Sequence, residues 1–191
     1  REAGALDGVP IASAPNIMRT ILLRRAGAYV LDIVILFAFL APLGYLVQHA
    51  IGASPSTAQG VYATLVLNFS LPAWTYFALA DRSRDGATFG KRLLSLRTEA
   101  EGGEHLRGKQ AVLRTAVKMV PWEVAHASSF LFAPALGEFA VGNWIGIGAS
   151  YALSFAYLLV AWRTQGHRSV HDFVASTSVE QADGPSVSTA L

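Results

Sequence analysis

The sequence predicts an all-α fold, a polytopic membrane bundle of about four transmembrane helices with a small cytoplasmic hairpin and interfacial helices. The first supporting observation is composition: 52% of the 191 residues are hydrophobic and only 15% are charged, whereas soluble domains have roughly 25% charged residues. The second is that the apolar residues gather in runs of about 20, the length with which a helix crosses a bilayer. The third is the lack of Cys, which excludes a small disulfide-stapled fold and thiol chemistry.

The N-terminal half contains a predicted tail and two predicted spans. Residues 1–17 are polar and read as a flexible tail. The first predicted span covers 26–47 and is interrupted by a single charge, Asp32. The second covers 57–80 and contains Asn68. Both runs are long enough to cross a bilayer as helices.

A polar, basic segment separates the second span from the rest of the chain. Apolar and polar residues alternate over 94–98, and a Gly pair follows at 102–103. This pattern predicts a small surface hairpin. Residues 106–118 have apolar residues on one helical side and basic residues elsewhere, which predicts an interfacial amphipathic helix.

Two further spans are predicted at 119–137 and 141–162, and residues 181–191 read as a disordered tail. The stretch 119–137 is the more polar span, but charge topology supports its crossing. With four spans and both termini inside, all 15 Lys and Arg residues lie on one side, and the two outer turns contain none. Basic residues favour the cytoplasmic side of short loops. We therefore expect a multi-pass protein of a bacterial-type inner membrane with both termini cytoplasmic.

Arg25 and Asp32 are the first candidate functional pair. Seven residues apart, they share one helical face, with Asp32 about 10 Å deeper along the axis. An ionised carboxylate facing lipid there costs about 2.5 kcal/mol or more. We therefore expect Asp32 to face the bundle interior, to be paired or to be protonated.

Glu123, His126 and Asn68 are candidate neighbours of Asp32. Glu123 and His126 lie three residues apart on one face of the third predicted span, and Asn68 lies in the middle of the second. Pro72 lacks the backbone donor that the Asn68 carbonyl needs in a regular helix. Together these groups suit a proton or small-cation pathway. The alternative is structural hydrogen bonding between helices, worth about 0.6 kcal/mol for each contact.

The fourth predicted span has a stripe of small residues with a period of four. Such a stripe allows close contact between membrane helices. The partner of this stripe is another helix of the chain, a second copy in a homo-oligomer, or a larger membrane complex. Its members are Gly142, Gly146, Ser150 and Ser154.

Several other function classes are not supported. Gly86–Lys91 resembles a phosphate-binding loop but has three residues between its glycines and Arg after the Lys, so it lacks the required spacing. The basic loop lies beside two spans, which favours anionic lipid headgroups over nucleic acid as its partner. His167 and His171 lack a third metal ligand. We expect no enzyme activity, no cofactor and no metal site.

Three segments, in order, resemble the membrane domain of the RDD family. They are RRAGAYVLDIVIL (24–36), DGATFGKRLLSLRT (85–98) and GHRSVHDFVASTSV (166–179). The first contains the Arg and Asp of the family's opening helix, Arg25 and Asp32. The family-motif positions in the rest of the chain are Gly86, Thr88, Gly90, Lys91, Arg92, Arg114, His171, Asp172 and Thr177.

The resemblance covers the predicted domain at 18–180 and implies a role in membrane transport. For some members it implies exchange of a monovalent cation for protons, and other members are accessory parts of membrane assemblies. Glu123 and His126 lie outside the family pattern. The leading hypothesis is therefore small-ion transport, with Asp32 as the titrating group and Arg25 tuning it. The alternative is a non-catalytic accessory or structural subunit of a larger membrane complex.

Overall fold

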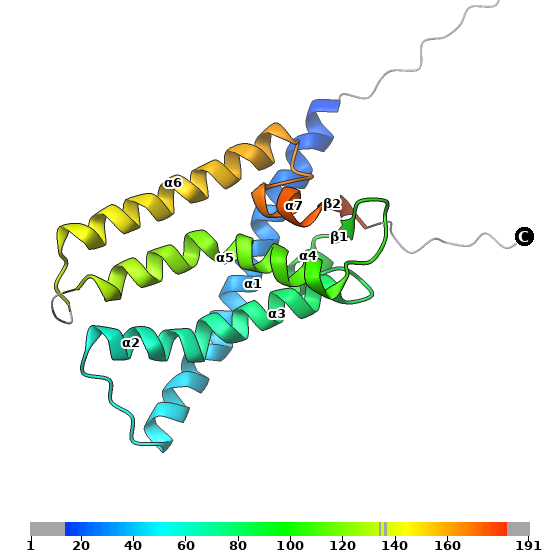
Figure 1. The fold of residues 1–191 in the computed structure, drawn as a ribbon. Helices are drawn as coiled ribbons and strands as arrows, with labels where there is room; N and C mark the ends of the chain where they lie inside the picture. The colour runs from blue at the N-terminus through cyan, green and yellow to red at the C-terminus, as the bar shows by residue number, and fades with distance from the viewer. Residues whose placement is uncertain (1–13, 134, 136, 183–191) are drawn as a thin grey trace, which may run out of the picture.

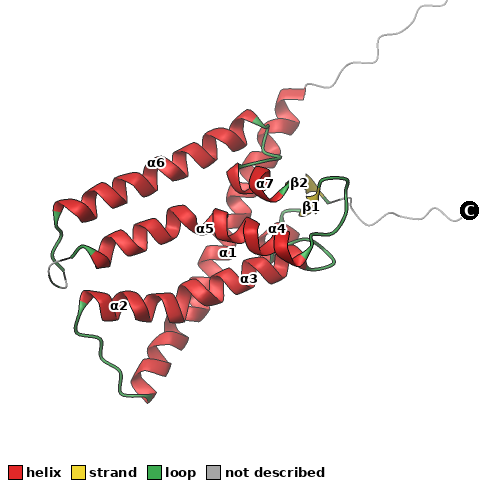
Figure 2. Cartoon of the chain, viewed as in Figure 1, coloured by secondary structure: helices red, strands yellow, loops and turns green. Residues whose placement is uncertain are grey.

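The computed structural model describes residues 14–133, 135 and 137–182, and most of them are helical (Figures 1 and 2). Most of the two predicted tails, 1–17 and 181–191, lies outside these residues. The helix α1 nevertheless begins within the first of them, at Ala14. The elements in chain order are α1 (Ala14–Ala50), α2 (Ala58–Leu65), the π-helical turn η1 (Val66–Ser70), α3 (Leu71–Arg82), α4 (Phe89–Leu93), β1 (Leu96–Ala100), α5 (Gly108–Leu131), α6 (Val141–Arg163), α7 (Val170–Ala175) and β2 (Thr177–Gln181).

In the described part of the chain, three helical segments are long and apolar enough to cross a membrane. They are Ile21–Ala50, Ala58–Arg82 and Val141–Arg163, and they correspond to the first, second and fourth predicted spans. Their outward faces carry large apolar side chains, such as Phe39 on α1 and Phe155 on α6, which are 74% and 66% exposed. Lipid in place of water around these faces accounts for such exposure.

The second span is one helix with a π turn in its middle. α2 passes through η1 directly into α3, and the N–H of Leu71 donates to the carbonyl of Val66, five residues earlier. The π turn occurs where Pro72 withholds a backbone donor, so the helix locally widens its hydrogen-bond spacing. Asn68 lies in this turn.

The third predicted span, 119–137, is the C-terminal half of the long helix α5. The predicted interfacial helix at 106–118 forms the N-terminal half of the same helix. α5 ends at Leu131, before the predicted end, and it is not among the three helices apolar enough to cross by themselves. It packs against α6, α3, α2 and α7, a central position in which a polar helix is shielded from lipid. The fourth crossing stays a prediction.

The predicted local hairpin does not form, because β1 has no strand partner directly after the Gly pair in the described chain. β1 does form after the residue alternation at 94–98, but it pairs antiparallel with β2, near the C-terminus, from Leu96 opposite Gln181 to Ala100 opposite Thr177. The Gly pair at 102–103 instead turns the chain toward α5. The buried side of this ribbon packs on α1, where Leu96 and Val179 contact Ala28. The ribbon thus joins the middle of the chain to its C-terminal segment and holds both against α1.

The main apolar core lies where α1, α3 and α5 meet. Its fully buried members are Ala73, Phe77 and Met119, with Tyr29 and Trp122 packed against them. In Figure 1, α4, α7 and the ribbon gather at one end of the long helices. We call this part the motif end, because the segments 85–98 and 166–179 lie there.

Candidate functional site at the motif end

The loop at 86–92, which belongs to the second family-like segment, is built around two tight contacts. Gly86 has a positive φ of 57°, and a Cβ there would strike the backbone carbonyl of Thr98. Gly90 lies against α1, where a Cβ would strike the carbonyl of Ala28. Only Gly allows both approaches. Thr88 caps α4 by accepting a hydrogen bond from the Lys91 N–H. These contacts fix α4 on α1.

Seating α4 on α1 brings neutral hydrogen-bond donors to Asp32. Oδ1 of Asp32 accepts hydrogen bonds from the backbone N–H of Gly90 at 2.8 Å and from the Tyr76 hydroxyl at 2.7 Å. Asp32 is 2% exposed. Among the described residues it has no ion-pair partner. Of the three expected arrangements, the structure has Asp32 facing the bundle interior, without a pair to Arg25. Arg25 and Asp32 share one face of α1, but the guanidinium of Arg25 binds elsewhere.

Arg25 binds the closing segment of the chain. Its Nη2 lies 2.6 Å from Oδ2 of Asp172, and its Nη1 donates to the carbonyl of Gly166 at 2.7 Å. Arg114 of α5 donates to the other oxygen of Asp172 through Nε at 2.9 Å. Thr177 donates to that same oxygen at 3.2 Å. One carboxylate thus connects α1, α5, α7 and the start of β2.

A second buried carboxylate, Asp81, extends this network to α3 and α4. The same Arg114 binds Oδ2 of Asp81 through Nη1, and Lys91 Nζ lies 2.6 Å from Oδ1 of Asp81. Lys91 also donates to the Thr98 hydroxyl. Arg114 is 1% exposed, and both carboxylates are fully buried. We call Arg25, Asp81, Lys91, Arg114 and Asp172 the ion network. Arg92, next to Lys91, forms an exposed pair with Asp85 and is outside this network.

Burial and the charges of the ion network shift the pKa values of groups in it and beside it. Burial disfavours the charged form of Asp172, but the neighbouring guanidinium groups of Arg114 and Arg25 outweigh burial and hold the pKa of this carboxyl well below 3.8. Burial lowers the pKa of Lys91 to about 8, although Asp81 opposes the shift. Burial and nearby cations also hold the pKa of His171 well below 6.5. His171 is therefore neutral at physiological pH.

A cavity of about 680 Å³ lies beside the ion network, with walls from α1, α5, α6 and α7. Its lining residues with acidic, basic or imidazole side chains are Arg25, Asp32, Lys91, Arg114, Lys118 and His171. Apolar and small side chains, including Trp122 and Ile147, line the rest. Arg25 and Asp32 thus face a shared cavity without contacting each other.

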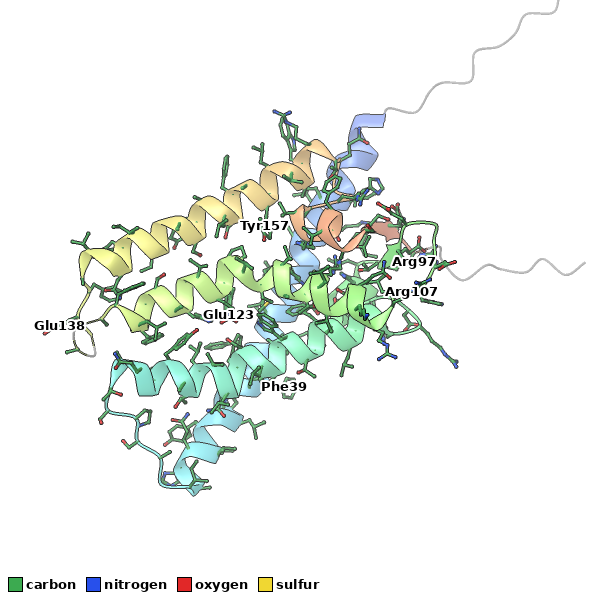
Figure 3. All side chains as sticks on the ribbon, viewed as in Figure 1. Phe39, Arg97, Arg107, Glu123, Glu138 and Tyr157 are labelled. Carbon is green, nitrogen blue, oxygen red and sulfur yellow. The ribbon has the colours of Figure 1, made fainter. Side chains whose placement is uncertain are left out.

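Glu123, His126 and Asn68 do not join Asp32. Glu123 accepts a hydrogen bond from Trp74 Nε1 at 3.1 Å, and Figure 3 shows it between α5 and α3. His126 packs edge-on against Trp122. With Asn68, it lines a second cavity of about 350 Å³ whose walls also come from α1 and α2. Asn68 contacts the backbone of α1 at Gly44. The predicted polar layer is therefore divided between separate places.

The small-residue stripe of α6 packs on α5 within the same chain. A Cβ at Gly146 would strike the side chain of Ser128, and one at Gly142 would lie 3.3 Å from the Phe132 ring. The Ser150 hydroxyl donates to the carbonyl of Pro121, the proline inside α5, at 2.6 Å. Ser154 lines the larger cavity. The stripe thus has an intrachain partner.

Sequence reasoning missed three contributors to the site. Asp81 reads as the first polar residue after a span, Lys118 as part of an amphipathic polar side, and Tyr76 as an interfacial aromatic. A carboxylate at the end of an apolar run, ten residues before the motif Lys91, is the signal that identifies Asp81. Among the described residues, no cluster of three or more His, Asp or Glu side chains is arranged to hold a metal ion.

The ion network brings together residues from every segment that resembled one family. Arg25 comes from the opening helix, Lys91 from the loop, Arg114 from α5 and Asp172 from the closing segment. Comparison with curated proteins and comparison with solved structures each gave no match. The model of the RDD family matches residues 20–176. With three apolar helices of membrane-spanning length, the chain is an integral membrane protein, and it belongs to the RDD family.

Proposed function

We propose that this chain is a small membrane transport protein that exchanges protons for a small monovalent cation, with Asp32 as the titrating group. The observation that carries the proposal is the environment of Asp32. It is a buried carboxylate within an apolar helix, it faces a cavity, and the hydrogen-bond donors on its Oδ1 are neutral.

Neutral donors hold the Asp32 carboxylate in place without cancelling its charge. A proton or a cation arriving through the cavity therefore changes the local charge in a low-dielectric place, where that change is energetically large. Asp81 and Asp172 differ, because each already binds guanidinium or ammonium groups. Arg25, bound to Asp172, acts on Asp32 through the shared cavity rather than by contact.

The test is ion exchange in proteoliposomes that contain a pH-sensitive dye. Sodium or potassium added to one side should release protons from wild-type vesicles, and Asp32→Asn should abolish that release while leaving insertion unchanged. Asp85→Asn is the matched control, since Asp85 is an exposed acid in a loop. Because four cationic side chains line the same cavity, chloride gradients form a further arm. Normal exchange by Asp32→Asn, or a response to chloride alone, would overturn the proposal.

The accessory-subunit alternative has lost its main argument. It depended on the small-residue stripe as a docking face, and that stripe packs on α5 within the chain. Gentle solubilisation still tests it: we expect the chain alone or with copies of itself, whereas a stable complex with unrelated chains would favour the accessory role.

We also propose that the motif end faces the cytoplasm of a bacterial-type inner membrane. Further basic residues lie on the side of the bundle that holds the ion network, namely Arg24, Arg92 and Arg163. This distribution agrees with the rule that basic loops stay on the cytoplasmic side. Single Cys residues introduced at positions 92 and 53, in a chain that has no other Cys, test this orientation. Position 53, in the turn after α1, should react with an impermeant thiol reagent in intact cells, and position 92 should not.

A further inference from the structure

The larger cavity is lined by four cationic side chains and one carboxylate, Asp32. Arg25, Lys91 and Arg114 each contact a carboxylate of the ion network. Lys118 has no ion-pair partner among the described residues. Its Nζ instead lies over the rings of Phe77, at 3.4 Å from the centroid, and Tyr29, at 4.9 Å. Ring faces compensate only part of the cost of a partly buried ammonium. Burial and the neighbouring Lys91 lower the pKa of Lys118. Four cations surround the cavity against the three carboxylates of Asp32, Asp81 and Asp172, so the charged form of Lys118 lacks an anion of its own.

The same cavity is apolar toward α6 and opens there. Tyr151 and Leu158 line it and are 73% and 53% exposed. They belong to a helix that is apolar enough to span a membrane. α6 packs on α5, while α1 forms the opposite wall and has little contact with α6. The cavity mouth between α1 and α6 therefore faces the region where acyl chains lie.

The larger cavity has a cationic inner end and an apolar opening, so its chemistry is complementary to an amphiphile with an anionic headgroup. A volume of about 680 Å³ falls within the range of roughly 300–1,000 Å³ for sites that hold one small molecule. A free inorganic anion would neutralise Lys118 but leave the apolar walls unfilled. A neutral lipid would fill the walls but leave the charge.

We propose that the cavity holds one membrane lipid with an anionic phosphate headgroup, with its phosphate beside Lys118 and an acyl chain leaving between α1 and α6. This site is internal and differs from headgroup contacts along the basic loop. It does not depend on ion exchange, because retention of the lipid is measured in detergent without an ion gradient, so each proposal can fail without the other.

Native mass spectrometry of the purified chain in detergent tests the proposal. Phosphatidylglycerol, phosphatidylcholine and inorganic phosphate are offered separately. We expect one phosphatidylglycerol to stay bound, at least tenfold more than phosphatidylcholine, and Lys118→Gln to lose this preference. Lys109→Gln is the matched control, an exposed Lys on the same helix. Lys118→Arg keeps the charge and should keep the lipid.

A second readout locates the lipid, because Trp122 lines the cavity. In a variant with Trp122 as its one Trp, phosphatidylglycerol brominated on its chains should quench fluorescence, and brominated phosphatidylcholine should quench much less. Equal quenching or equal retention of the two lipids overturns the proposal, even if Lys118→Gln does not fold. Retention by Lys118→Gln at the wild-type level, or retention of phosphate without lipid, overturns it as well.

Discussion

The motif end and the opposite half of the bundle use polar residues in different ways. At the motif end, two carboxylates and three cations share partners, and every member is largely buried. In the opposite half, polar groups occur singly, as in the pair of Trp74 with Glu123 and the contact of Ser150 with a carbonyl. Figure 1 shows that short elements surround only the motif end, while the opposite half consists of long helices and their connections.

The difference shows which interactions hold the short elements in place and which hold the long helices. Short elements such as α4 and α7 bury too little apolar surface to hold their positions, so ion pairs fix them on α1, α3 and α5. Long helices are positioned by close packing and need only occasional hydrogen bonds. We therefore expect substitutions at the motif end to cost more than substitutions of single polar groups elsewhere.

The largest effect should come from Arg114→Gln. The change leaves Asp81 and Asp172 without their shared cation, and breaking a buried ion pair from one side typically costs about 3–5 kcal/mol. We expect little folded protein, measured as a monodisperse peak and a thermal unfolding temperature in detergent. Arg92→Gln is the control, because its exposed pair with Asp85 is worth roughly 1 kcal/mol or less. Equal stability of the two variants would show that the ion network is not what fixes the short elements.

A smaller effect should come from Gly146→Ala, which tests packing in the opposite half. The new methyl group meets the side chain of Ser128 on α5, and overpacking of this kind costs typically about 1–3 kcal/mol. Gly148→Ala is the matched control, two residues away with open space at its Cβ position. The unfolding temperature should fall for the first variant and hold or rise for the second. If oligomeric state changes instead, the stripe also serves contacts between chains.

Sequence analysis predicted the long apolar elements and the family correctly, because lipid makes composition a direct signal of the spans. The prediction of a local hairpin after β1 was wrong. It was made because a Gly pair directly after a strand suggests a local turn. Pairing with β2 depends on the return of the C-terminal segment to α1, a contact between residues far apart in sequence. The fourth span remains a prediction, because the polar half of α5 lowers its mean hydropathy.

The site was harder to predict than the fold. The shared face of Arg25 and Asp32 follows from helical periodicity, but their separate partners depend on how α4 and α7 dock. Helical depth alone suggested that Glu123 lies near Asp32. It does not determine how α5 is rotated about its axis, and that rotation turns Glu123 toward Trp74 instead.

The smallest effect should come from Glu123→Gln, which tests whether Glu123 makes only a single structural contact or also takes part in proton exchange. A Gln side chain still accepts the hydrogen bond from Trp74, so the loss should be about 0.6 kcal/mol or less, as for other single polar contacts in membrane bundles. Proton exchange in vesicles should also stay near the wild-type level, since Glu123 lies outside the set of residues lining the larger cavity. A large loss of exchange with an unchanged unfolding temperature would place Glu123 on the proton path. It would then support the polar layer of Asp32 and Glu123 that the sequence predicts.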